Sequence, residues 1–197
     1  MDSFYQFIES LGSIAPAPGG GAAAGYSLSM GAACVEKAAR FSLTDNLEYF
    51  LEKFIEVREN GILLAQEDQE KFNQWQKARK KKNKEDIDKK AVECTKVPFK
   101  VANYALSLLS TIDEFLPNCN KWLISDASAG AAHASAAFDT SVFNILINIP
   151  SIKDEHFSNE LKLFLNDNVE SFNQTRDVIY KKCEEIICKK AMFNLYK

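Results

Sequence analysis

The fold is decided by residues 16–35, which read PAPGGGAAAGYSLSMGAACV. Residues 14–35 include no charged side chain, and their apolar residues are mostly alanine rather than leucine or phenylalanine. Such a composition gains too little on transfer into hydrocarbon to span a membrane, despite its length and the Gly21 and Gly25 pair. We therefore expect a helix over about residues 22–43 that packs very closely against another helix or a second subunit.

Apolar residues at helical spacing recur along the rest of the chain, without a strand or hairpin pattern. Pro98 predicts a kink or a break near Val97, and the last helix is long enough to be interrupted. The sequence predicts an all-α protein, a multi-helical bundle with long helices in one domain, residues 1–197, dimerising through its small-residue helix. The expected helices cover residues 2–11, 22–43, 47–79, 87–115, 125–149 and 154–196.

Composition restricts the class of protein. Hydrophobic residues make up 46% and charged residues 26%, as in globular proteins, and the net charge of −3 provides no basic field for nucleic acid. The five cysteines are odd in number and lack a CxxC pair, which fits a reducing compartment. The two histidines lack metal-ligand spacing, so we expect no bound metal. Without a secretory signal, we expect a cytoplasmic protein that does not bind membranes.

The turn before the small-residue helix is a candidate ligand loop. Pro16 and Pro18 stiffen it, and the glycines at positions 19–21 let a ligand approach the backbone. Free amide groups and the dipole at a helix start favour an anion or a polar carbonyl edge. The alternative is a structural turn that serves close helix packing. No Lys-Ser/Thr pair follows and no strand precedes, so neither a P-loop nor a dinucleotide fingerprint is indicated.

Asp68 lies among apolar residues of the expected helix 47–79. On a helix it shares a face with Leu64, Ala65, Phe72 and Trp75. A carboxyl group on an apolar face has its pKa raised by desolvation, which makes it a candidate general acid or base. The alternative is a structural aspartate bonded to a backbone turn.

The segment NCNKWLISDA, residues 118–127, leads into another expected helix. Ser125 or Asp126 is a natural helix cap. Beyond them, small and polar residues line one face of the helix, namely Gly130, His133, Ala137, Thr140, Asn144 and Asn148. Inside a bundle such a stripe makes room for a polar ligand or lines a wet subunit interface.

Lys77 to Lys84 form the one charge run, in which six of eight residues are basic and none is acidic. The run is either a solvated helix end or a dock for a polyanion. Because no aromatic residues interleave with the basic ones, nucleic acid is a weak candidate.

Three motifs in order resemble a known family. PAPGGGAAA at 16–24, EDQEKFN at 67–73, and NCNKWLISDA followed by FNILINI at 143–149 are similar to the formiminotetrahydrofolate cyclodeaminase and methenyltetrahydrofolate cyclohydrolase family. The resemblance covers most of the chain. It implies an all-helical dimer whose ligand site lies at or near the subunit interface. It also implies a tetrahydrofolate derivative as substrate, with no further cofactor and no metal.

Carried over by motif, the resemblance implies that Asp68 and Asp126 are the working carboxylates. Lys71, the Trp122-Leu123 pair and His133 depart from the family pattern, which puts the exact reaction in question and leaves the fold intact. Including Pro18 from the turn and His133 from the stripe, the expected substrate-binding residues are Pro18, Gly19, Gly20, Gly21, Asn120, Ser125, His133, Asn144 and Asn148.

The expected reaction is hydrolysis of 5,10-methenyltetrahydrofolate to 10-formyltetrahydrofolate. The alternative is cyclodeamination of formiminotetrahydrofolate, in which ammonia leaves, and the second alternative is a catalytically idle relative that binds folate or a protein. Both reactions need an acid and a base, and we expect the pKa of Asp68 to be raised more than that of Asp126. For a polyglutamylated folate, we expect residues 77–84 to bind the tail.

Overall fold

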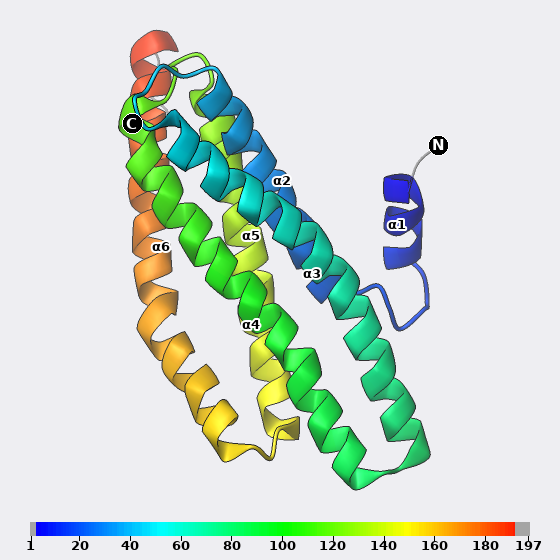
Figure 1. Cartoon of the computed structure of the whole chain (residues 1–197). Coiled ribbons are helices and arrows are strands. Elements are labelled where there is room, and N and C mark those ends of the chain that lie inside the picture. The colour runs from blue at the N-terminus through cyan, green and yellow to red at the C-terminus, as the bar shows by residue number, and fades with distance from the viewer. Residues whose placement is uncertain (1–2, 192–197) are drawn as a thin grey trace.

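The computed structural model describes residues 3–191, and every regular element within them is helical. Helices α2 to α6 form an elongated bundle, and α1 stands to one side of it (Figure 1). The all-α prediction is confirmed. The elements are α1 (Ser3–Leu11), α2 (Gly20–Arg40), α3 (Leu47–Lys81), α4 (Lys84–Phe115), the 3₁₀ turn η1 (Leu116–Asn118), α5 (Ile124–Asn148), the 3₁₀ turn η2 (Ile149–Ser151) and α6 (Glu155–Ala191).

Most helix ends lie within three residues of their predicted positions. Of the kink or break predicted near Val97, the break is wrong. α4 runs unbroken through Pro98, which is buried in its middle. Proline removes one backbone donor, but α4 packs against α3, α5 and α6 and continues as a helix on both sides of Pro98. α6 is likewise uninterrupted to Ala191, and the rest of its predicted range lies outside the described residues. None of the described helices combines the length and apolar character needed to cross a membrane.

The hydrophobic core lies along the axis of the bundle. At one end the rings of Phe50 and Phe54 on α3 meet Phe115 on α4 edge to face, with centroids 5.3 and 5.8 Å from it. Further along, Phe138 of α5 stacks on Phe172 of α6. All five rings are at most 1% exposed, so truncating any one to alanine removes about 3–5 kcal/mol of stability.

Helix α2 packs at backbone contact against both of its neighbours. A Cβ atom added at Gly25 would lie 2.7 Å from the backbone nitrogen of Ala65 on α3. One added at Gly31 would lie 2.9 Å from the carbonyl oxygen of Gly130 on α5. Only glycine fits at these crossings, so the prediction of very close helix packing is confirmed. The contacts also fix α2 antiparallel to both helices.

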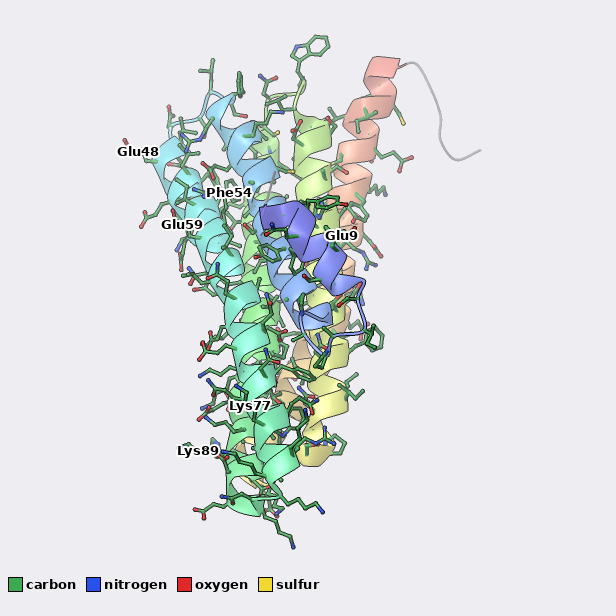
Figure 2. The ribbon with its side chains drawn as sticks, turned by 90° about the vertical axis from the view of Figure 1, so that its right-hand side faces the viewer. Glu9, Glu48, Phe54, Glu59, Lys77 and Lys89 are labelled. Atoms are coloured by element: carbon green, nitrogen blue, oxygen red, sulfur yellow. The ribbon has the colours of Figure 1, made fainter. Side chains whose placement is uncertain are left out.

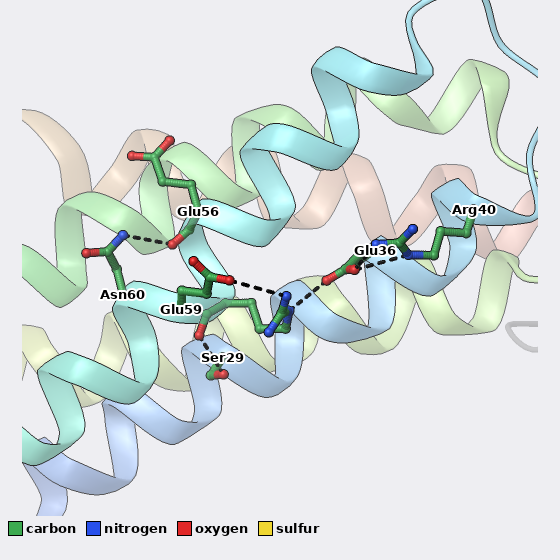
Figure 3. A network of polar contacts seen from close by, with 7 residues as sticks. Ser29, Glu36, Arg40, Glu56, Glu59 and Asn60 are labelled. Atoms are coloured by element: carbon green, nitrogen blue, oxygen red, sulfur yellow. Dashed lines mark hydrogen bonds and ion pairs between the residues drawn. The ribbon is translucent and has the colours of Figure 1, made fainter.

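A buried ionic network fastens α2 to α3 away from the glycine turn (Figure 3). The Glu36 carboxylate is 9% exposed and accepts hydrogen bonds from Arg40 at 2.6 Å and Arg58 at 2.7 Å. The Ser29 hydroxyl donates to the carbonyl oxygen of Arg58 at 2.8 Å. Burial opposes ionisation of Glu36, but the hydrogen bonds from both arginines outweigh it and hold its pKa below the usual value.

Candidate functional site

A cavity of about 220 Å³ lies where the start of α2 meets α3, α4 and the end of α5. The loop before α2 closes one side of it through Pro16 and Ala17. The structure thus brings together segments that are far apart in the sequence. Six of the predicted site residues line this cavity, namely Gly19, Gly20, Gly21, Asp68, Asn144 and Asn148.

Asp68 faces Gly21 across the contact between α2 and α3. A Cβ atom at Gly21 would lie 2.5 Å from the carboxyl carbon of Asp68, so only glycine leaves room for this carboxylate. The backbone N–H of Ala22 donates a hydrogen bond to it. That donor is one of the N–H groups that the first turn of a helix leaves unpaired. The contact gives Asp68 a structural role beside any chemical one.

The environment of Asp68 changes its acidity. Burial removes the carboxylate from water and raises its pKa from 3.8 to about 6, and the Ala22 bond offsets only part of this effect. A carboxyl group with this pKa exchanges its proton near neutral pH, as a general acid or base must. Burial thus acts on this carboxyl group in the direction that its apolar helix face predicted.

The end of α5 supplies two amides to the cavity. Asn144 and Asn148 are one turn apart and both line the wall. The Nδ2 atom of Asn144 is shielded from solvent and has no hydrogen-bond partner among the described residues. It lies beside Gly20, where an added Cβ atom would be 3.9 Å from it. The Asn144 amide can therefore donate to an acceptor in the cavity.

Asp126 lies at the other end of α5. From Asn144 it is about 27 Å along the helix, at about 1.5 Å per residue. Its carboxylate accepts a hydrogen bond of 3.2 Å from Lys37, near the end of α2. Within one chain, Asp68 and Asp126 therefore do not form a catalytic pair.

Four other predicted site residues also lie away from the cavity wall. Pro18 is buried behind the glycine turn. Asn120 holds the loop before α5, because its Nδ2 donates to the carbonyl of Phe41 and its Oδ1 accepts from the backbone N–H of Trp122. His133 packs against Gly31 at the crossing of α2 and α5. Ser125 is the fourth and is exposed in the first turn of α5.

The predicted cap at Ser125 or Asp126 is wrong. Leu123 is the residue before α5, and no side chain caps the helix there. The backbone N–H of Leu123 donates to the carbonyl of Asn120 at 2.8 Å, and this turn starts the helix one residue early. Asp126 still lies in the first turn, where the helix dipole stabilises a carboxylate.

The formiminotransferase-cyclodeaminase family model matches residues 3–166. The chain belongs to this family. A methenyltetrahydrofolate cyclohydrolase of Methylorubrum extorquens is 26% identical over 176 residues, which are 81% of this chain and 85% of that protein. A solved formiminotetrahydrofolate cyclodeaminase from Thermotoga maritima matches with a TM-score of 0.82, at 24% identity and over 98% of both chains.

The family match confirms the resemblance that the three motifs indicated. Members of the formiminotransferase-cyclodeaminase family process one-carbon units on folate. Sequence reasoning missed several cavity residues of this member, among them Cys94 and Pro98 on α4. Burial, with a smaller effect of Asp68, raises the pKa of the Cys94 thiol to about 12, so it stays protonated. Among residues 3–191, no group of three or more His, Cys, Asp or Glu side chains could hold a metal ion.

Proposed function

We propose that the protein hydrolyses 5,10-methenyltetrahydrofolate to 10-formyltetrahydrofolate, with Asp68 moving the proton. The observation that carries this proposal is a carboxyl group with a pKa of about 6, held in a cavity opposite Gly21. The relative named a methenyltetrahydrofolate cyclohydrolase supports this direction of the chemistry.

The proposed steps need one group that accepts and then returns a proton. Water adds to the carbon that bridges the two folate nitrogens, and ionised Asp68 accepts a proton from it. The bond from that carbon to one nitrogen then breaks, Asp68 returns its proton to the departing nitrogen, and the added hydroxyl group loses its proton as it becomes the formyl C=O. The bridge is cationic and the product is neutral, so one proton leaves to solvent in each turnover. Asn144 orients the folate by donating from Nδ2 to an acceptor on it.

The alternative reaction is cyclodeamination of formiminotetrahydrofolate. Its support is the fold shared with the structure named a formiminotetrahydrofolate cyclodeaminase. Here a folate nitrogen attacks the formimino carbon, and Asp68 in its protonated form gives the proton with which ammonia leaves. The same carboxyl group thus serves either reaction.

A homodimer is part of this proposal, because it gives Asp126 a place in the site. α2 and α5 lie side by side and antiparallel, with Gly31 and Gly130 near the middle of their contact. A twofold axis through this middle brings the partner's Asp126 and the partner's Lys37 toward the glycine turn. The five cysteines are free, which fits the cytoplasm as the place of action.

One assay tests the proposal. The purified protein receives 5,10-methenyltetrahydrofolate or 5-formiminotetrahydrofolate, and the absorbance of the methenyl compound is followed together with ammonia. Loss of the methenyl compound without ammonia release supports hydrolysis. Ammonia release from the formimino compound supports the alternative. Folate binding without either reaction would identify an idle relative and refute both.

A further inference from the structure

Pro98 leaves one backbone carbonyl of α4 without its helical partner. In an α-helix the N–H of each residue donates to the carbonyl four residues earlier, and proline has no N–H. The carbonyl oxygen of Cys94 therefore lacks the donor that position 98 normally supplies. Because α4 continues as a helix, the N–H groups of Val97 and Phe99 go to the carbonyls on either side of it. No hydrogen bond from a side chain of the described residues ends on this oxygen.

The unpaired carbonyl belongs to the wall of the cavity that holds Asp68. Cys94 and Pro98 are one turn apart on the same face of α4, and both line the cavity. The carbonyl of Cys94 points along the helix toward the turn of Pro98. Figure 2 shows α3 and α4 side by side along this half of the bundle, with Lys77 and Lys89 labelled toward its end. The Cys94 thiol is close enough to Asp68 for that carboxylate to raise its pKa.

The cavity thus carries an unpaired donor on one side and an unpaired acceptor on the other. The donor is the Nδ2 atom of Asn144 on α5, which is shielded from solvent. On the α4 side, the thiol of Cys94 and the ring of Pro98 accept hydrogen bonds far more weakly than a carbonyl does. A buried carbonyl without a donor costs free energy until a ligand or water donates to it. A ligand with an N–H edge toward α4 and an acceptor toward Asn144 satisfies both groups.

We propose that the Cys94 carbonyl accepts a hydrogen bond from a ring N–H of the bound folate, and that Pro98 keeps this oxygen free. The proposal rests on the proposed function, because it takes a folate as the ligand. A folate ring carries N–H donors as well as acceptors, so it matches the pair of groups in the cavity. Pro98 is a positioning residue, since it acts on the ligand through the carbonyl that it leaves unpaired.

Giving position 98 an N–H tests the proposal. In Pro98→Ala the new N–H pairs with the Cys94 carbonyl inside the helix and takes it from the ligand. The probe is 5-formyltetrahydrofolate, which has the folate ring but not the reacting bridge. Its dissociation constant, measured by calorimetric titration, should rise about tenfold, as for one lost hydrogen bond. In turnover of the preferred substrate the loss should appear in KM rather than in kcat.

A matched variant removes the proline ring without adding a donor. Pro98→lactic acid, introduced by stop-codon suppression, has the methyl group of alanine but an ester oxygen in place of the N–H. It should bind 5-formyltetrahydrofolate about tenfold more tightly than Pro98→Ala, whatever the proline ring itself contributes. The urea midpoint of Pro98→Ala should equal or exceed that of wild type, because alanine suits a helix interior better than proline. Weaker binding then cannot be ascribed to a damaged fold.

The outcomes that overturn the proposal are separate from those that overturn the proposed function. Equal affinities of the two variants would assign any effect to the proline ring, and the proposal would be wrong. Wild-type affinity of Pro98→Ala with a lower kcat would place the carbonyl on the attacking water, which also overturns it. A wild type that binds the probe but converts neither substrate refutes the proposed reactions, and the affinities still decide the role of the carbonyl. A wild type that does not bind the probe overturns both.

Discussion

Replacing Asp68 by asparagine separates the chemical role of this residue from its structural one. The pKa of Asp68 rises from 3.8 to about 6 on folding because the carboxylate is buried. At about 1.4 kcal/mol per unit, ionising it in the folded protein costs about 3 kcal/mol more than in the unfolded chain. Between pH 4 and 6 the folded state binds more protons than the unfolded chain does. The free energy of unfolding of the wild type therefore falls by about 3 kcal/mol as the pH rises through that window.

Asp68→Asn should therefore be at least as stable as wild type at pH 8. The variant avoids the cost of about 3 kcal/mol for ionising a buried carboxyl group, but its amide oxygen accepts a weaker hydrogen bond from the Ala22 N–H. The expected net gain in the free energy of unfolding is about 1–2 kcal/mol. Below pH 4 the gain should vanish, since the wild-type carboxyl group is then neutral. Turnover should fall by about two to four orders of magnitude.

The assay combines urea midpoints at pH 4 and pH 8 with turnover on the preferred folate. Asp139→Asn is the matched control, because Asp139 is an exposed acid on α5. It should change neither quantity. A lowered midpoint at pH 8 with wild-type turnover would show that Asp68 only caps the first turn of α2. The assignment of the proton to this carboxyl group would then be wrong.

Three further predictions have defined outcomes. Glu36→Gln should lower the free energy of unfolding by about 2–3 kcal/mol at pH 7 in urea, because it leaves two arginines without their carboxylate. That loss should shrink as the pH falls through the lowered pKa of Glu36. Gly21→Ala should reduce turnover about a hundredfold, since its methyl group meets the Asp68 carboxyl group. Neutralising the basic residues of 77–84 should remove any tighter binding of long polyglutamate tails over the monoglutamate at low salt, measured by titration.

Residues that share a helix were the predictable part of the site. The spacing around Asp68 placed it on an apolar face, and the spacing of Asn144 and Asn148 placed both amides on one side of α5. The contact between Gly21 and Asp68 was not predictable, because periodicity reports which residues share a helix and not which helices meet. Cys94 was missed for the same reason, since it reaches the cavity from α4.

Some misses had a local cause. The predicted cap at Ser125 is wrong because a backbone turn, closed by the hydrogen bond from the Leu123 N–H to the Asn120 carbonyl, starts α5 before Ser125. Pro98 failed as a helix breaker because packing on several sides outweighs one lost hydrogen bond. The separation of Asp126 from Asn144 was available from the sequence, since a continuous helix carries them about 27 Å apart.

The glycine crossings of α2 limit how this cavity can be redesigned. At Gly25 and Gly31 backbone meets backbone, so no smaller residue exists with which to widen the gap between these helices. A larger residue would push α2 away and move Gly21 off Asp68. Room for a bulkier or differently shaped ligand must therefore come from the loop at Pro16 or from trimming Ile147, which is 75% exposed at the wall. Directed evolution of this scaffold should thus change specificity through residues such as Pro16 and Ile147, and it should leave Gly25 and Gly31 unchanged.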